Sequence, residues 1–313
     1  LPDLVGRLAA RRRLWGCSAE SLRAVRDPFR VARSLARRGA AMPRMREASD
    51  APPADGSWLV KRRRSSGGFG VAVWRGSPAT LRPDDAYFQQ RLAGPSFSTV
   101  FVADGNTARF RGATRQYVGR FGAAPFHYCG SLGPLALSRE RRAEWERIGA
   151  ALAAAFGLVG VFGVDAVRHR GRLHVVDVNP RWPASAEVLE KATEGASIMG
   201  EHAAACREGR LPCELGPRRG VVGKAILFAD RPFIADDRLT RQLVVEAIAS
   251  APTAADVPAA GTAIGAGEPI CTRFVYGSSE GETARLLFAQ AASFARRLSP
   301  DQLASALINE SEK

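Results

Sequence analysis

The stretch Val161–Arg181 constrains the fold of this chain most strongly, because it reads as a strand, a turn and a second strand with acidic residues on both strands. Side chains alternate between the two faces of a strand, so Asp177 and Asn179 share one face of the second strand. If the loop is the three residues Arg170–Arg172, Asp165 on the first strand pairs directly with Asp177. Their Cβ atoms then lie roughly 5 Å apart.

Two opposed carboxylates repel each other and destabilise a sheet unless a cation lies between them. Asp165, Asp177 and Asn179 form a set of hard oxygen donors without His or Cys. This set suits Mg²⁺, with Mn²⁺ as an alternative, and leaves positions for phosphate and water. The competing interpretation is that both aspartates are solvated, as acidic residues on strands often are. The pairing, the added amide and the Arg181 that follows favour the metal hypothesis.

A second candidate site combines a lysine with a glycine-rich turn. Lys61 ends the strand Trp58–Lys61, and the turn Ser65–Gly70 leads into the next strand, Val71–Trp74. Because this turn joins two strands, it differs from the phosphate loops that lead into a helix. A glycine hairpin can instead close over phosphates with its backbone N–H groups, and a lysine ammonium can contact a phosphate oxygen. An ordinary turn and a surface lysine remain the alternatives.

Net charge is +14 over 313 residues, which raises the hypothesis of an acidic partner. Only four of the 45 basic residues are lysines, and the arginines are scattered along the chain. The runs Arg11–Arg13 and Arg62–Arg64 are short, which favours solvated faces over a nucleic-acid footprint. A polyanionic substrate such as ATP also fits a basic chain.

The five cysteines form no CxxC pair and no zinc pattern, which is typical of reduced thiols in a cytoplasmic protein. The uncharged stretch Ile148–Val164 is broken by glycines and is shorter than a membrane span, so we expect a helix end that runs into a buried strand. No membrane partner is therefore expected. Because the chain starts at Leu1, a preceding segment and a removed targeting peptide stay open.

The remaining pattern predicts helices and strands along the whole chain. Residues 1–48 read as helical, with Asp27 as an N-cap before Pro28. Further expected elements are strands over Tyr87–Leu92 and Ser98–Ala103, a long helix from the cap Ser138 to Gly157, helical segments around Glu187–Glu190 and Gly200–Arg207, a strand-rich region from Val221, and a closing helix over Glu282–Leu298.

In one order along the chain, Lys61, the glycine turn, the "QQRLAG" strand and the "GVDAV…VVDVNPR" hairpin resemble an ATP-grasp enzyme. The resemblance covers about residues 50–205. It implies an α+β, ATP-grasp fold with two α+β lobes and the nucleotide between them. It also implies that the N-terminal α/β subdomain of such enzymes is truncated here, and that the C-terminal portion is strand-rich. The implied domains are a helical tail of that subdomain over 1–48, an ATP-grasp domain over 49–210 with a small lobe at about 50–90 and a large lobe at about 91–210, and a C-terminal extension with its closing helix over 211–313.

The resemblance also implies roles for particular residues. Lys61 is similar to the phosphate-binding lysine, and Arg181 to the arginine near the transferred phosphate; both are candidate catalytic residues. The metal ligands would be Asp165, Asp177 and Asn179. The ATP-binding set comprises Lys61, the lid glycines Gly67, Gly68 and Gly70, and the adenine hinge Gln89, Gln90, Arg91 and Leu92, which would bind through its backbone. Asp177 and Gln90 depart from the pattern, because the family usually carries Glu at the former and often carries Glu at the latter.

A narrower likeness involves "GATRQYVG", "PFHYCGSLGP" and "NPRWPASAEVLE". These segments resemble ATP-grasp proteins associated with tetrahydromethanopterin- and methanofuran-type one-carbon coenzyme biosynthesis. A substrate loop would then include Arg115, His127, Tyr128 and Ser131. His127 and Tyr128 could equally pack beneath the loop.

The function implied is a ligase that uses ATP and Mg²⁺ to join a carboxylate to an amine, with an acyl-phosphate intermediate and release of ADP and phosphate. Its partners would be small-molecule substrates, with no nucleic acid, and the oligomeric state stays open with a homodimer as one alternative. Two further hypotheses are kept. One is a nucleotide-binding module without turnover, and the other is a basic nucleic-acid-binding protein.

Overall fold

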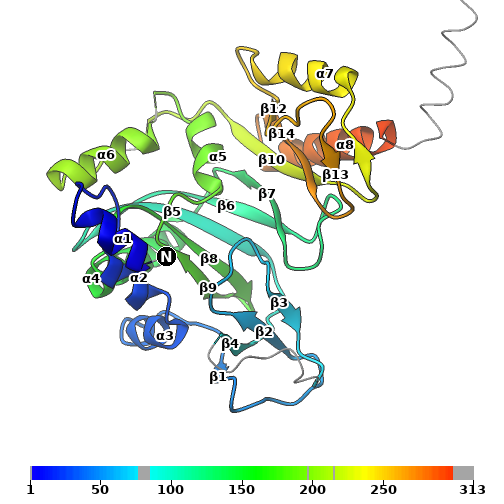
Figure 1. Ribbon diagram of the computed structural model, residues 1–313. Coiled ribbons are helices and arrows are strands. Elements are labelled where there is room, and N and C mark those ends of the chain that lie inside the picture. The colour runs from blue at the N-terminus through cyan, green and yellow to red at the C-terminus, as the bar shows by residue number, and fades with distance from the viewer. Residues whose placement is uncertain (1, 77–84, 196, 214–215, 299–313) are drawn as a thin grey trace, which may run out of the picture. The chain divides into compact units, whose positions relative to one another are not determined.

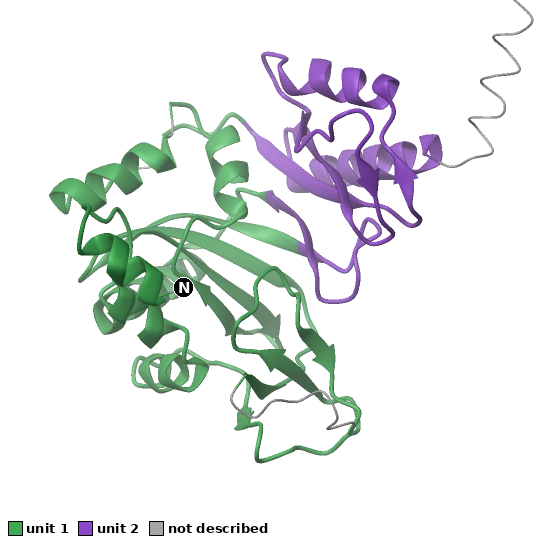
Figure 2. Cartoon of the chain, viewed as in Figure 1, with its two compact units in different colours: residues 1–116, 133–219 green, residues 117–132, 220–313 purple. Residues whose placement is uncertain are grey.

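The computed structural model describes residues 2–76, 85–195, 197–213 and 216–298. Figure 2 shows the division of the chain into two units. Unit 1 comprises residues 1–116 and 133–219, and unit 2 comprises residues 117–132 and 220–313. The chain leaves unit 1 within strand β6 (Ala108–Val118) and returns to it within strand β7 (Tyr128–Gly133).

Unit 1 holds six helices and seven further strands besides β6 and β7 among its described residues (Figure 1). The helices are α1 (Pro2–Ala9), α2 (Ala19–Val25), α3 (Pro28–Ala36), α4 (Arg139–Phe156), α5 (Ser185–Lys191) and α6 (Ile198–Glu208). The strands are β1 (Met45–Glu47), β2 (Trp58–Arg62), β3 (Val71–Val73), β4 (Ala86–Gln90), β5 (Ser96–Asp104), β8 (Val159–His169) and β9 (Arg172–Asn179). Local signals explain several helix ends. Asp27 caps α3 by accepting from Phe29 N at 2.9 Å, and Gly157 ends α4 in the left-handed conformation.

A small antiparallel sheet in unit 1 has the strand order β1-β4-β2-β3. One face of this sheet packs Trp58, Trp74 and Phe88 together. Because side chains alternate along a strand, Lys61 on β2 and Gln89 on β4 lie on the opposite face. The sheet therefore separates a hydrophobic face from a polar face that carries the lysine.

The other strands of unit 1 pair antiparallel in the order β6-β5-β8-β9, and helices cover both faces of β5. On one face α4 lies against Phe101, and it approaches so closely that a Cβ on Gly149 would lie 2.3 Å from the Phe101 ring. On the other face, α5 and α6 pack against Val100, Val102 and Val161. Asp165 lies four residues beyond Val161 on β8, and because side chains alternate along a strand it lies on the same face as Val161.

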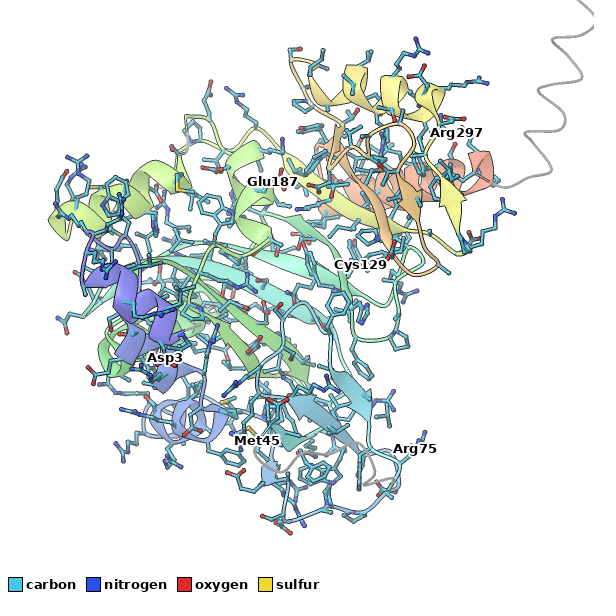
Figure 3. All side chains as sticks on the ribbon, viewed as in Figure 1. Asp3, Met45, Arg75, Cys129, Glu187 and Arg297 are labelled. Atoms are coloured by element: carbon cyan, nitrogen blue, oxygen red, sulfur yellow. The ribbon has the colours of Figure 1, made fainter. Side chains whose placement is uncertain are left out.

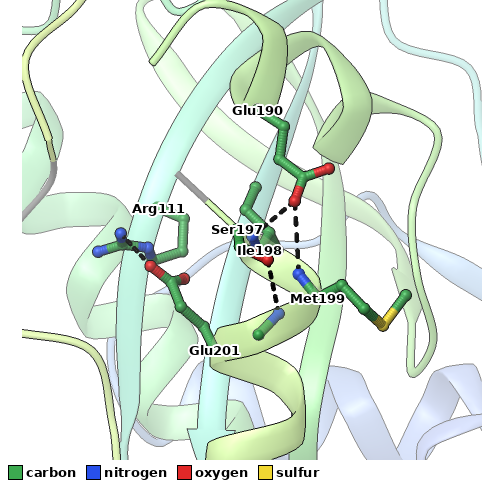
Figure 4. Close-up of polar contacts among 7 residues, drawn as sticks. Arg111, Glu190, Ser197, Ile198, Met199 and Glu201 are labelled. Carbon is green, nitrogen blue, oxygen red and sulfur yellow. Dashed lines mark hydrogen bonds and ion pairs between the residues drawn. The ribbon is translucent and has the colours of Figure 1, made fainter. Parts of the chain in front are cut away.

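Polar contacts hold α6 in place (Figure 4). Glu190 Oε1 accepts from the backbone N–H of Ile198 at 2.7 Å, which satisfies a donor at the first turn of α6. Arg111 on β6 forms an ion pair with Glu201 on α6, and the Arg111 side chain is only 5% exposed. Loss of either partner would leave a buried charge unpaired, so this pair fixes the helix against the sheet.

Unit 2 contains the strand order β12-β14-β10-β7 and two helices within the part of the chain that the structure describes. Its elements besides β7 are β10 (Val221–Phe228), β11 (Phe233–Ile234), α7 (Asp237–Ala247), β12 (Ala254–Ala255), β13 (Ala263–Ile264), β14 (Pro269–Gly277) and α8 (Glu280–Arg297). Leu287, Ala291 and Phe294 of α8 enter the core of this unit. Figure 3 draws the described side chains and labels Cys129, a buried residue of β7.

Most of the elements expected from the sequence are confirmed, including helices near the N-terminus, the capped helix α4 and the closing helix α8. The prediction that residues 1–48 are helical is wrong at its end, because α3 stops at Ala36 and Met45–Glu47 pair with β4 as strand β1. The prediction of a strand-rich region from Val221 missed helix α7, of which only Leu243 is buried. Ile148–Val164 does run from a helix end into a buried strand, as expected. None of the helices that the structure describes is both long and apolar enough to cross a membrane.

Candidate functional site

The hairpin β8–β9 places Asp165 directly opposite Asp177, as the sequence predicts, but by a different route. The loop has two residues, Arg170 and Gly171, both with positive φ, instead of the expected three. A β-bulge then shifts the register, because Ala166 pairs with Val175 while Asp165 pairs with Asp177. Val176 is therefore the extra residue of the bulge, a feature often found beside functional sites.

Asp165 lies among amide donors. Its Oδ1 accepts from Gln116 Nε2 at 3.0 Å, and its Oδ2 accepts from Asn179 Nδ2 at 3.0 Å. Burial and the neighbouring Asp177 raise the pKa of Asp165 to about 6, although hydrogen bonds from Ser98 and Asn179 and the charge of Lys61 act against this rise. A cation between the two carboxylates would remove their repulsion.

The donor set fits a hard divalent cation. Asp165 and Asp177 supply carboxylates on the same face, and Asn179, paired with Gly163, adds an amide two residues further along β9. The described residues contain no cluster of three His, Cys, Asp or Glu side chains that could hold a metal ion, so phosphate and water oxygens would have to complete the shell. Arg181 is exposed, and its guanidinium donates to Asn179 Oδ1 at 3.3 Å.

The Lys61 ammonium lies between the small sheet and this hairpin. It donates to Gln89 Oε1 at 3.3 Å and to the Val176 carbonyl at 3.1 Å, and it lies 5.7 Å from the centre of the Tyr87 ring. Burial disfavours the charged form of Lys61, but the neighbouring Tyr87 side chain and the carboxylates of Asp177 and Asp165 favour it and on balance raise the pKa of the ammonium. Lys61 therefore stays charged at neutral pH.

The glycine-rich turn joins β2 to β3, as expected, and does not lead into a helix. Gly67, Gly68 and Gly70 all have positive φ, a backbone conformation that residues other than glycine rarely adopt. The Gly70 carbonyl accepts from Arg62 N at 3.0 Å, which places the turn one residue beyond Lys61. A Cβ on Gly70 would also lie 3.0 Å from the Arg62 side chain. Both its conformation and its surroundings thus require glycine here.

Most backbone N–H groups of the segment Gln89–Leu92 are already hydrogen-bonded within the protein and are therefore not available to a ligand. Gln90 N donates to Arg44 O at 2.7 Å and Arg91 N donates to Ser57 O at 2.8 Å. Leu92 N has no hydrogen-bond partner among the described residues, and it is the donor of this segment that remains available to a ligand.

The four residues of the expected substrate loop fall in both units. Arg115 is exposed in unit 1, where its guanidinium lies 5.7 Å from the centre of the Phe97 ring. The other three residues are in unit 2, where the hydroxyl groups of Tyr128 and Ser131 lie 2.9 Å apart. His127 is half-buried and Ser131 is fully buried.

Sequence reasoning missed the side chains that surround Asp165. Gln116 lies inside the "GATRQYVG" segment, yet only the neighbouring Arg115 was singled out. Ser98 pairs with Asp165 on one side and with Thr114 on the other, so alternation along β6 places Gln116 on the same face. That alternation was a usable signal, whereas the pairing of β6 with β5 was not visible in the sequence.

Comparisons with known proteins bear on the fold. The ATP-grasp domain family matches residues 25–185, and no curated protein shows significant similarity to the chain. Carboxyaminoimidazole ribonucleotide synthase from Aspergillus clavatus, solved in complex with ATP, matches with a TM-score of 0.72 at 16% identity, over 95% of this chain and 80% of that chain. L-amino acid ligase from Bacillus licheniformis matches with a TM-score of 0.70 at 14% identity, over 94% and 76%. Biotin carboxylase from Campylobacter jejuni matches with a TM-score of 0.64 at 12% identity, over 90% and 69%. At such identities these likenesses show a common fold.

Proposed function

The chain belongs to the ATP-grasp family, and on that premise we propose that it is an ATP-dependent ligase that joins a carboxylate to an amine. The observation that carries the proposal is the arrangement on hairpin β8–β9. Asp165 faces Asp177 there, and the carbonyl of the intervening Val176 accepts from the Lys61 ammonium. An acidic pair beside a charged ammonium suits a divalent cation together with a polyphosphate.

Asp165, Asp177 and Asn179 would hold Mg²⁺, which neutralises and orients the phosphates of ATP when it is bound. Lys61 would contact a phosphate oxygen as a point charge, and the backbone N–H groups of the Gly67–Gly70 turn would cover the phosphates. Adenine would lie against the Gln89–Leu92 segment, where Leu92 N has no partner within the described part of the chain and could donate to it.

The proposed reaction has two steps. A substrate carboxylate oxygen attacks the γ-phosphorus of ATP, the bond to the β-phosphate oxygen breaks, and ADP leaves. An amine then attacks the acyl carbon and loses a proton, the bond from that carbon to the phosphate oxygen breaks, and phosphate and an amide are formed. Arg181 would stabilise charge on the transferred phosphoryl group, and such an arginine changes phosphoryl-transfer rates by orders of magnitude. The glycine turn would exclude water, which otherwise hydrolyses the acyl phosphate.

The identity of the substrates is a narrower proposal. The segments around Arg115, His127, Tyr128 and Ser131 resemble ATP-grasp proteins of one-carbon coenzyme synthesis, which supports tetrahydromethanopterin- or methanofuran-type precursors as substrates. Mass spectrometry of product pools formed with such precursors and with unrelated amino acids would test this, and products from the unrelated set alone would contradict it.

The central experiment measures Mg²⁺–ATP binding by thermal melting and ADP release with pools of carboxylic acids and amines. We expect Asp177→Ala to abolish the nucleotide-dependent rise in melting temperature, because the cation loses a carboxylate ligand. Asp230→Ala, which removes an exposed aspartate in unit 2, serves as the matched control. An unchanged rise in Asp177→Ala would contradict the metal assignment.

A second candidate function is favoured by Asp177 itself, which is one methylene shorter than the glutamate usual at this position in the family. A shorter carboxylate could hold nucleotide without supporting turnover. Tight Mg²⁺–ATP binding with no ADP release for any pairing of carboxylate and amine would favour this nucleotide-binding module and refute the ligase.

A further inference from the structure

We propose that Gln89 is a positioning residue for Lys61, and that its side chain, rather than its backbone alone, sets where the ammonium meets the phosphates. The inference deepens the proposed function and rests on it for the role of the phosphates. The contact itself is independent of any bound nucleotide. The resemblance to ATP-grasp enzymes implies that Gln89 belongs to the adenine hinge through its backbone, and the proposal gives its side chain a second role.

The Gln89 amide and the Lys61 ammonium form a closed set of contacts with one carbonyl. Gln89 Oε1 accepts from Lys61 Nζ at 3.3 Å, Lys61 Nζ donates to Val176 O at 3.1 Å, and Gln89 Nε2 donates to Val176 O at 3.5 Å. Gln89 is only 2% exposed, so its amide is held away from solvent. A buried amide keeps both of its groups hydrogen-bonded, and here they engage the ammonium and the carbonyl.

The β-bulge explains why that carbonyl takes part. Asp165 pairs with Asp177 and Ala166 pairs with Val175, so Val176 has no partner residue on β8. A bulged residue disrupts the regular ladder and can redirect its own groups. The Lys61 ammonium, on β2 of the small sheet, contacts hairpin β8–β9 through the Val176 carbonyl. The Gln89 side chain, on β4 of the same sheet, contacts the same carbonyl.

A neutral amide is well matched to this task. It fixes the direction of the ammonium through one hydrogen bond, and it adds no negative charge that would compete with phosphate for Lys61. Gln90, the next residue on β4, lies on the opposite face of the sheet, where its Oε1 accepts from Arg44 Nε at 3.4 Å. The arrangement is therefore specific to the face of β4 that carries Gln89.

The first test uses the ligand-free protein and needs no nucleotide. The chain has four lysines, so acetylation by acetic anhydride can be followed at each one by mass spectrometry. We expect Lys61 to react several-fold faster in Gln89→Met than in the wild type, since Met has a similar shape but holds no ammonium. Gln89→Glu, which keeps the acceptor, should restore slow labelling. Lys191 provides the internal reference, and Gln242→Met, an exposed residue of α7, provides the matched control. An unchanged Lys61 rate in Gln89→Met overturns the proposal.

The second test measures binding of ATP, ADP and adenosine in the presence of Mg²⁺. Loss of a hydrogen bond to a charged group weakens binding by roughly tenfold, so we expect that loss for ATP in Gln89→Met and no loss for adenosine, which carries no phosphate. In a double-mutant cycle, Gln89→Met should add nothing to Lys61→Met, because both changes act on the same ammonium. Equal losses for ATP and adenosine, or additive effects, would show that Gln89 acts on adenine and would overturn the proposal.

The two tests separate this inference from the proposed function. A wild-type protein that binds neither ATP nor ADP refutes the proposed function, and the acetylation rates alone then decide whether Gln89 holds Lys61. If Gln89→Met fails to fold, Gln89→Leu takes its place, and melting temperatures identify the variant to use.

Discussion

Replacement of Asp165 by Asn should stabilise the ligand-free protein at neutral pH. Asp165 lies opposite Asp177 on the neighbouring strand, so the two carboxylates repel each other when both are ionised and metal has been removed. A folded-state pKa of about 6, against an ordinary value of 3.8, is caused mainly by burial and then by Asp177. At about 1.4 kcal/mol per pKa unit, this difference corresponds to about 3 kcal/mol of lost stability when Asp165 is ionised.

The sign follows from proton binding. Because the folded state holds the Asp165 proton more tightly than the unfolded state, stability falls as pH rises from about 4 to about 6, and the loss is complete above the folded pKa. Asp165→Asn removes this loss. Its advantage over the wild type should therefore be near zero at pH 4 and should reach up to about 3 kcal/mol at pH 7.5.

The assay is thermal unfolding of both proteins in EDTA, followed by circular dichroism between pH 4 and pH 7.5. The quantity compared is the difference in the free energy of unfolding between variant and wild type, because other groups titrate in both proteins. Asp104→Asn is the matched control with the opposite sign. Asp104 Oδ1 accepts from the backbone N–H groups of Asn106 and Thr107 at 2.9 and 2.8 Å, and despite the opposing effect of burial these bonds lower its pKa. If the difference in the free energy of unfolding between Asp165→Asn and the wild type does not change with pH, the reasoning is refuted.

Three further predictions address the site, the thiols and the core. Arg181→Ala should retain Mg²⁺–ATP binding within a few-fold and lose ADP release by two or more orders of magnitude, measured by calorimetry and a coupled assay; equal losses in both would place Arg181 in binding. At pH 8, iodoacetamide should label exposed Cys213 well before Cys129, because burial raises the pKa of the Cys129 thiol to about 11, and mass spectrometry of digests would show the order. Gly149→Ala should lower stability by about 1–3 kcal/mol despite the better helix propensity of Ala, since its Cβ would lie 2.3 Å from the Phe101 ring; an unchanged melting temperature would contradict the close packing of α4.

Local signals in the sequence predicted much of the fold. Ser138 and Gly157 bracket α4 because a capping hydroxyl and a glycine with positive φ act within a few residues. Helix α7 was missed although Asp236, which caps it by accepting from Leu239 N, was a usable local signal, because the strand-rich prediction from Val221 was extended over it.

The candidate site was predictable where it depends on one hairpin and unpredictable where it depends on distant strands. Asp165 and Asp177 are joined by a short turn, and their shared face follows from alternation. The contact of Gln89 with Lys61 requires β4 to pair with β2, and its contact with Val176 requires the small sheet to meet β9. Such pairings between segments far apart in sequence are set by tertiary packing and leave no local pattern.

The bulge at Val176 connects the two halves of the candidate site. A regular ladder continued from the two-residue turn would pair Asp165 with Val176, and it would direct Asp177 to the other face of the sheet. By taking up Val176 as an extra residue, the hairpin restores Asp177 to the face of Asp165 and presents the Val176 carbonyl to Lys61. The same insertion therefore brings together the carboxylates suited to a cation and fixes the ammonium suited to a phosphate. Because one backbone irregularity sets both positions, a change in this hairpin's register would disturb the metal ligands and the phosphate contact together.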